Sequence, residues 1–228
     1  MKYQITLILI LCFKYCCLGQ FQINLNLKHE LDSILNLDQI FREYIDTNTG
    51  EMKKDSIAKA TGYIRNELDT HAWEIINKID SANLKRIEEL IKEYGYVGKS
   101  LVGEPTNKTM WYVIQHSDKI DNYLPIIENA GKKGEISFTL VAMMKDRWLM
   151  RKGKEQVYGT QVKGFKTKNK TTGNDEWLMF VWPIEDAKNV NIRRKEAGFS
   201  TTVEENAKNL GVEYKEFTLD EISKMPKY

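Results

Sequence analysis

Residues 27–45, LKHELDSILNLDQIFREYI, decide the fold class of this chain. Apolar side chains recur there every three or four positions, which is the spacing of one face of an α-helix, at Leu27, Leu31, Ile34, Phe41 and Ile45. Asp38 stands where this face would carry its next apolar residue, and Arg42 follows four positions later. The stretch therefore predicts an amphipathic helix with a carboxylate in its apolar seam.

The same periodicity predicts helices along most of the remaining chain. Apolar positions indicate helices over residues 57–79, 84–94, 123–130 and 135–151, and short helices after Ile184. Residues 109–118 fit either a strand or a helix, and we favour a helix. Helices are therefore expected to dominate the fold.

Two strand-like runs, residues 155–165 and 176–182, interrupt the helical pattern. The polar stretch 163–176 is typical of a hairpin loop between them. Alternation along the first run would place Gln156, Tyr158 and Thr160 on one face and Gln161 on the other. The predicted fold class is mainly α with a small antiparallel β-hairpin or sheet (α+β), in a single compact domain.

The first nineteen residues are typical of an export signal, because Lys2 precedes an apolar run and Cys17-Leu18-Gly19 offers a cleavage site before Gln20. A membrane-spanning helix needs ~20 apolar residues, which is more than residues 5–13 supply, so no stable membrane span is expected after cleavage. We expect a signal peptide over residues 1–19 and one helix-rich domain over residues 20–228. The expected location is periplasmic or extracellular, and a lipid anchor is disfavoured.

Cysteine content and net charge exclude several classes of function. The three cysteines lie within the predicted signal, so the mature protein would have no disulfide and no thiol nucleophile. Removing Lys2 and Lys14 lowers the count of Lys and Arg from 34 to 32, which equals the 32 Asp and Glu. A formally neutral chain has no electrostatic reason to bind nucleic acid, and we expect no such partner.

Three short polar phrases mark a candidate site: QHSD at 115–118, DR at 146–147 and QVYGTQ at 156–161. Charged and amide side chains within otherwise apolar segments are costly unless each finds a partner. Such a concentration indicates a hydrogen-bond network or a place where a ligand binds. The phrases predict the position of a site, and they leave its chemistry open.

The first hypothesis is a hydrolase-like enzyme that acts on a polar substrate, namely a sugar, a peptide or an anionic compound. His116 would be the general base, Asp118 or Asp146 would orient its ring, and Arg147 would hold an anionic group. Tyr158 would donate a proton or a hydrogen bond. The predicted substrate-binding side chains are Gln115, Gln156, Thr160, Gln161, Arg42 and Gln39.

Other interpretations remain open. A metal site would use His116, Asp118 and Asp146, but their spacing matches no paired-histidine motif, and we expect no metal and no cofactor. The same phrases fit a non-catalytic module that binds a small molecule or a polar polymer. They also fit a buried network that only docks elements. For Asp38 and Arg42 we favour a simple ion pair within one helix.

Several phrases in a fixed order resemble a bacterial family, domain of unknown function 6624. The resemblance runs from about Leu31 to Gly198 and implies membership but no reaction. It is carried by Asp38-Gln39 with Arg42, Asp80 with Asn83, residues 98–103, Gln115-His116-Ser117-Asp118, Pro125, Asp146-Arg147, residues 156–161, Pro183-Ile184-Glu185-Asp186 and Arg193-Arg194. The family's usual Trp-Pro in the glycine-rich turn is replaced here by Tyr96-Val97.

Overall fold

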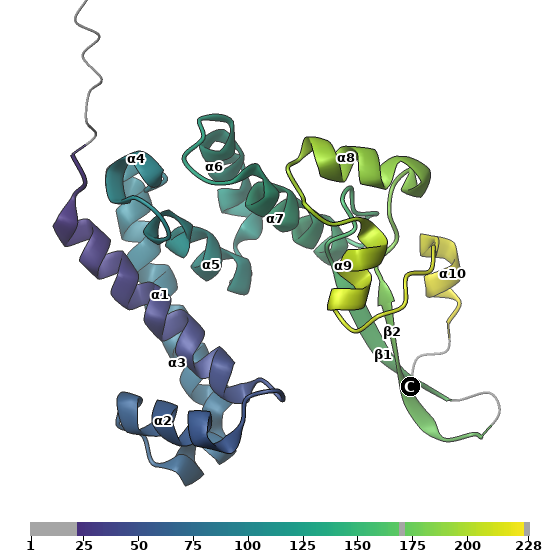
Figure 1. Ribbon diagram of the computed structural model, residues 1–228, viewed down its shortest axis with the longest axis horizontal. Helices are drawn as coiled ribbons and strands as arrows, with labels where there is room; N and C mark the ends of the chain where they lie inside the picture. Colours follow the sequence, from purple (N-terminus) through teal and green to yellow (C-terminus); the bar gives the residue numbers. More distant parts are fainter. Residues whose placement is uncertain (1–21, 169–171, 226–228) are drawn as a thin grey trace, which may run out of the picture.

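The computed structural model describes residues 22–168 and 172–225, and helices make up most of this part of the chain (Figure 1). The predicted export signal lies outside the described residues. The elements are α1 (Leu25–Ile45), α2 (Glu51–Thr61), α3 (Arg65–Tyr94), α4 (Lys99–Val102), η1 (Thr106–Lys108), α5 (Thr109–His116), α6 (Ile120–Lys132), α7 (Phe138–Arg151), β1 (Val162–Lys168), β2 (Asp175–Val181), η2 (Ala187–Asn189), α8 (Val190–Glu196), α9 (Val203–Asn209) and α10 (Leu219–Ser223). The fold is α+β in a single domain, as the sequence predicts.

Helices α1 and α3 run side by side and carry the N-terminal half of the molecule (Figure 1). Asn24 caps α1 by accepting a hydrogen bond from the Leu27 N–H at 3.1 Å. The predicted apolar face is buried, and Leu31 packs in one core cluster with Ile87 and Leu90 of α3. Asp38 is buried within the same face, as its place in the repeat indicates.

The boundaries of the next helices differ from the prediction. The helix expected over residues 57–79 is two helices, because Gly62 adopts the left-handed conformation at φ 74° and ends α2. The break expected before Leu84 is absent, since α3 continues from Arg65 to Tyr94. Asp80 therefore lies on the middle of a helix, where its side chain is free to meet a neighbouring element.

Helices α5, α6 and α7 complete the main core. Residues 109–116 form α5, which confirms the predicted helix. The Trp111 indole N–H of α5 donates to the Leu140 carbonyl at 2.7 Å and so fixes α5 against α7. Ile114, Ile127 and Met144 are fully buried where the three helices meet. His116, the last residue of α5, is thereby held at the rim of the core.

The β-hairpin begins later than predicted, and its strands extend further into the predicted loop. Val162 pairs with Val181 and Lys168 with Asp175, so much of the polar stretch expected as a loop belongs to the strands. Polar residues are compatible with a strand here because one face of an antiparallel hairpin can remain in water. Residues 155–161 form a loop in place of a strand, since Gly159 turns the chain at φ 67°.

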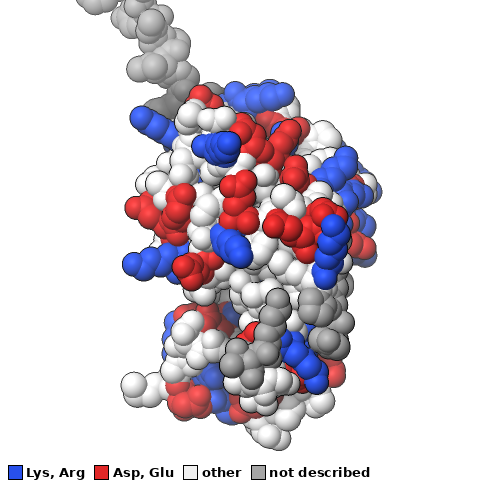
Figure 2. Space-filling model, turned by 90° about the vertical axis from the view of Figure 1, so that its right-hand side faces the viewer, with Lys and Arg blue, Asp and Glu red and all other residues white. Residues whose placement is uncertain are grey.

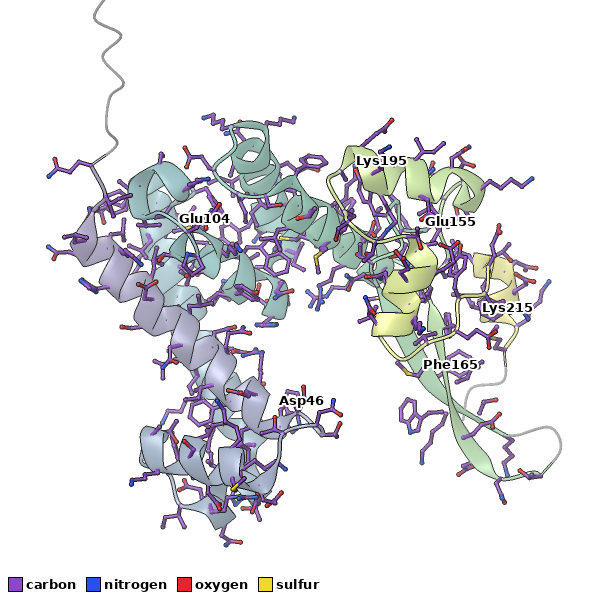
Figure 3. All side chains as sticks on the ribbon, in the orientation of Figure 1. Asp46, Glu104, Glu155, Phe165, Lys195 and Lys215 are labelled. Atoms are coloured by element: carbon purple, nitrogen blue, oxygen red, sulfur yellow. The ribbon has the colours of Figure 1, made fainter. Side chains whose placement is uncertain are left out.

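The tail forms short helices, as expected, and these helices pack against the hairpin. Phe180 and Trp182 pack with Ile222 of α10, and Val203 of α9 packs with Val181. Figure 3 shows side chains between the hairpin and these helices, with Phe165 on β1. The face drawn in Figure 2 carries intermixed positive and negative side chains. Among the described helices, none is long and apolar enough to cross a membrane.

Candidate active site

The buried carboxylate of Asp38 is the centre of a polar cluster formed by α1, α3 and α5. Its Oδ1 lies 3.2 Å from Nδ1 of His116 on α5, and its Oδ2 accepts a hydrogen bond from Gln39. Only 1% of its side chain is exposed, so this charge depends on protein partners for solvation. The apolar seam of α1 therefore brings a carboxylate to the one histidine found in a polar phrase.

Arg42 joins Asp38 to a second carboxylate on α3. The guanidinium lies 3.5 Å from Asp38 Oδ1 and 2.6 Å from Asp80 Oδ2. It also donates to the main-chain carbonyl of Asp38. The predicted ion pair within one helix is thus present, but it is part of a network that includes α3 and, through Asp38, His116.

His116 connects this cluster to the surface. About 19% of its side chain is exposed, and it lines a hollow of about 370 Å³ together with Asp118, Trp148 and Arg151. Because Nδ1 faces Asp38, the opposite ring nitrogen, Nε2, is the atom that remains for a substrate or a water. This is the arrangement of a carboxylate that orients an imidazole.

Two basic side chains line the hollow beside His116. The Arg151 guanidinium donates to the carbonyls of Gln115 and Ser117, which flank His116, and Arg151 forms no ion pair with a described acidic residue. Lys152 pairs with Asp121 at 2.8 Å. Hydrogen bonds from Lys152 and from the Trp148 indole lower the pKa of Asp121. Arg151 is therefore the basic side chain of the hollow that has no ion-pair partner within the described chain, and Asp118 is an exposed acidic side chain of the same hollow.

Gln39 and Arg42, predicted to bind substrate, line a different and larger hollow of about 590 Å³ between α1 and α2. Asp46 also lines this hollow, and Figure 3 shows it where α1 gives way to α2. The cluster around Asp38 thus borders two hollows, one reached through Arg42 and one through His116.

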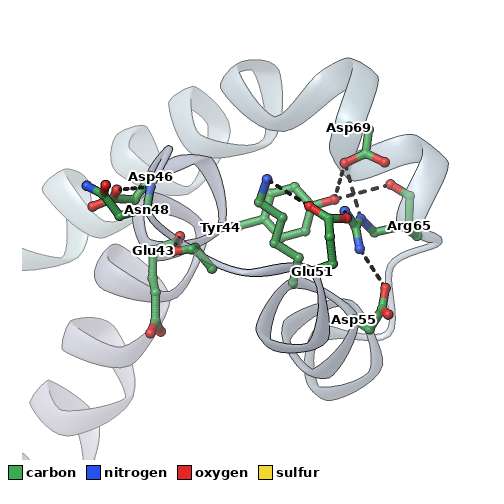
Figure 4. A network of polar contacts seen from close by, with 10 residues as sticks. Glu43, Tyr44, Asp46, Asn48, Glu51, Asp55, Arg65 and Asp69 are labelled. Carbon is green, nitrogen blue, oxygen red and sulfur yellow. Dashed lines mark hydrogen bonds and ion pairs between the residues drawn. The ribbon is translucent and has the colours of Figure 1, made fainter.

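A separate ion-pair network fixes α2 beside the larger hollow (Figure 4). Arg65 contacts Glu51 and Asp55 of α2, each at 2.5 Å, and Asp69 on α3 at 3.2 Å. Asp69 also accepts a hydrogen bond from the Tyr44 hydroxyl of α1, and this bond lowers the pKa of Asp69. Since each ion in this network has a partner, we interpret it as a structural clamp.

Asp146 does not contact His116 through any described interaction; it serves the loop before the hairpin. Its carboxylate accepts hydrogen bonds from the main-chain N–H groups of Val157, Tyr158 and Thr160 and from the Thr160 hydroxyl, at 2.8–3.2 Å. Burial raises the pKa of Asp146, and these hydrogen bonds oppose the rise. Because both oxygens of this carboxylate accept hydrogen bonds from the loop, the contacts favour a structural role for Asp146.

The side-chain amides of residues 156–161 also form their hydrogen bonds within the protein. Gln156 is fully buried, and its Nε2 donates to the carbonyls of Gln161 and Trp182, while its Oε1 accepts from the Gln161 N–H. The Gln161 side chain donates to the Thr160 hydroxyl at 3.0 Å. These contacts favour a structural role for Gln156, Thr160 and Gln161.

The remaining predicted residues are divided between this loop and the hollow beside His116. Arg147 is partly buried, burial lowers its pKa, and within the described chain it forms no ion pair. Burial raises the pKa of Tyr158, whose ring lies 6.1 Å from that of Phe199. Gln115 is buried and contributes its carbonyl to Arg151. Asp118 is exposed at the rim of the smaller hollow.

Among the described residues, Asp38, Asp80 and His116 offer ligand atoms that all lie within 4.8 Å of one another. This set differs from the metal alternative built on Asp118 and Asp146. The sequence analysis did not place Asp38 and Asp80 in the candidate site. The position of Asp38 in the apolar face of a predicted helix could have indicated its role. Asp80 gave no such indication, because the sequence predicts a break between two helices at that point.

The model of the family of unknown function DUF6624 matches residues 27–215. No curated protein and no solved structure matches the chain.

Proposed function

This chain belongs to the family of unknown function DUF6624, and we propose that it is a hydrolase-like enzyme in which His116, oriented by Asp38, acts as general base. The observation that carries the proposal is the 3.2 Å contact between His116 Nδ1 and a carboxylate that is 1% exposed, beside a hollow that the ring also lines. A buried carboxylate holds an imidazole in one orientation and stabilises the charge that it gains with a proton.

The proposed reaction uses water as the nucleophile. Nε2 of His116 removes a proton from a water molecule in the hollow, and the water oxygen attacks the electrophilic atom of the substrate. The imidazolium then returns the proton to the leaving group, so the enzyme ends the cycle unchanged. Asp38 keeps a proton on Nδ1 throughout, which leaves Nε2 able to accept one.

The basic side chains of α7 support a polar substrate that carries an anionic group. Arg147 and Arg151 are four positions apart, so they share one face of α7, and neither is paired with a described acid. Arg151 lines the same hollow as His116. Guanidinium groups bind carboxylates and phosphates through paired hydrogen bonds. Tyr158 is protonated at neutral pH, since its ordinary pKa of about 10 is raised further by burial, so its hydroxyl is a donor.

We also propose that the protein is exported, with mature residues beginning at Gln20. The basis is the arrangement of Lys2, the apolar run and the small residue Gly19. Amino-terminal sequencing of the protein recovered from outside the cytoplasm of a producing cell tests this. A protein that still begins at Met1 in that fraction contradicts cleavage.

The activity is tested with a panel of chromogenic esters, amides and glycosides, each in a neutral form and in a form that carries a carboxylate. We expect turnover of a carboxylate-bearing member, and a loss of about 10²–10⁴-fold in kcat for His116→Gln, the usual contribution of a general base. Rates should fall toward acid pH, where the protonated ring cannot accept a proton.

His71→Gln is the matched control, because His71 is an exposed histidine on α3 that contacts Glu74 at 3.3 Å. It should retain the wild-type rate. Turnover that survives His116→Gln contradicts the proposal, and so does a wild-type protein that hydrolyses no member of the panel.

A further inference from the structure

We propose that Asp38, Asp80 and His116 form a binding site for a divalent transition-metal ion, best matched by Zn²⁺. The metal site contains two residues of the proposed catalytic site, Asp38 and His116. Binding of the ion does not depend on the proposed function, whereas the predicted inhibition by the ion rests on it. One imidazole nitrogen and two carboxylate oxygens are the donors that Zn²⁺ accepts in proteins. Asp38 lies on α1, Asp80 on α3 and His116 on α5. The set is therefore assembled by the packing of three helices and not by a local sequence motif.

The spacing of the donor atoms fits one ion. Two ligands that are each bound to Zn²⁺ at the usual distances, with an angle between tetrahedral and octahedral, lie about 3.0–3.5 Å apart. His116 Nδ1 and Asp38 Oδ1 are separated by 3.2 Å. All three donors lie within 4.8 Å of one another, so side-chain rotations within the cluster would bring them to one ion.

A second observation concerns one of the same three residues. Asp80 Oδ1 is buried and has no hydrogen-bond partner within the described part of the chain, although the other oxygen of this carboxylate contacts Arg42. Buried carboxylate oxygens are almost always bonded to a donor or an ion, because leaving one bare costs free energy. A bound cation would satisfy this oxygen.

Arg42 supplies the positive charge of the cluster while no ion is bound. One guanidinium faces two carboxylates, so the cluster keeps a net charge of −1 when the ring is neutral. The Arg42 side chain is 22% exposed and lines the larger hollow, so it has room to swing aside. We therefore expect an ion and the guanidinium to compete, and Arg42→Met to bind the ion more tightly than the wild type.

Metal binding has a consequence for the proposed reaction. An ion on Nδ1 would separate His116 from Asp38 and draw charge from the ring, which weakens Nε2 as a base. Zn²⁺ should therefore inhibit hydrolysis at concentrations that fill the site.

The test is calorimetric titration of chelator-treated protein with ZnCl₂ alone, with MgCl₂ as a comparison. We expect one Zn²⁺ per chain, and weak or no binding of Mg²⁺, which prefers an all-oxygen octahedral site. Asp80→Asn and His116→Gln should each lower the affinity for Zn²⁺ by at least about tenfold, since each removes one ligand. His71→Gln, which alters an exposed histidine with a neighbouring carboxylate, should change it less than about twofold.

Histidine NMR of the wild type gives a readout that needs no variant. The chain has three histidines, and Zn²⁺ should shift the ring signals of His116 but not those of His71. No saturable binding, or equal affinity in wild type and Asp80→Asn, overturns the metal site. If the site binds Zn²⁺ as described but Zn²⁺ accelerates hydrolysis, the metal site stands and His116 as general base fails. If no ion binds while His116→Gln still abolishes hydrolysis, the metal proposal alone fails.

Discussion

His116 and Asp38 contact each other but depend on the fold to different degrees. Asp38 is buried and interacts with Gln39, Arg42 and His116, whereas His116 is partly exposed and has one described polar partner. Deleting a buried charge leaves its partners without compensation, while deleting a side chain at the rim leaves less behind. A residue held mainly for chemistry should cost little stability when replaced.

We therefore expect Asp38→Ala to destabilise the protein by about 2–4 kcal/mol, because Gln39 and Arg42 lose a buried acceptor. His116→Gln should cost less than about 1 kcal/mol, which is a fall in Tm of no more than about 4 °C at this size. Thermal melting at one pH measures both. If His116→Gln melts as low as Asp38→Ala, the histidine is a structural residue and the catalytic proposal loses its support.

At the scale of elements, α6 is docked to α3 by a partly exposed ion pair. Glu88 on α3 accepts from Lys119 Nζ at 2.7 Å and from the Tyr123 hydroxyl at 2.9 Å. The hydrogen bond from Lys119 lowers the pKa of Glu88 below its usual value of 4.5. A carboxyl with a lowered folded-state pKa contributes stability above its unfolded pKa, and this contribution is lost as pH falls through the folded value.

Glu88→Gln should therefore lower the Tm at neutral pH. The loss in free energy of unfolding should be no more than about 1 kcal/mol, because such pairs are screened by solvent. The difference from wild type should shrink as pH falls from about 4.5 through the lowered folded-state pKa, below which the wild-type carboxyl is also neutral. Melting curves from pH 3 to pH 7 test the sign. A difference that is constant or grows toward acid pH contradicts the proposed role of this pair.

Across the whole molecule, Asp146 links the N-terminal helices to the hairpin and the C-terminal helices. Asp146 lies on α7, and the N–H groups that donate hydrogen bonds to its carboxylate lie in the loop that leads into β1. Arg194 of α8 reaches the same loop by donating to the Tyr158 carbonyl at 2.8 Å. This junction holds together two parts of the fold that otherwise have separate hydrophobic clusters.

Asp146→Ala leaves three main-chain N–H groups without an acceptor, so we expect a loss of about 3–5 kcal/mol. The Tm should fall by roughly 10 °C in a chain of this size. Asp118→Ala, at an exposed position that borders a hollow, is the stability control and should melt within about 2 °C of wild type. An Asp146→Ala protein that melts with the control would mean that the loop does not need the carboxylate.

The sequence predicts the helices better than it predicts the site, for a physical reason. A helix follows from a repeat within one segment, as in α1, where the apolar face and the misplaced Asp38 can be read directly. Residues 155–161 are wrongly predicted as a strand because Gln156, Tyr158 and Thr160 alternate, whereas the Gln156 side chain bonds to the main chain of Gln161 within a loop. The family resemblance names Asp80, but its contact with Arg42 could not be predicted, since Arg42 is 38 positions away on another helix.

The most direct test of the central claim is the tautomer of His116, measured by long-range ¹H–¹⁵N NMR on chelator-treated protein at a pH where the ring is neutral. Because Asp38 can only accept, we predict a proton on Nδ1 and a bare Nε2. Asp38→Asn should remove this preference. A wild-type ring that carries its proton on Nε2 would contradict the account, since that nitrogen could not then act as a base.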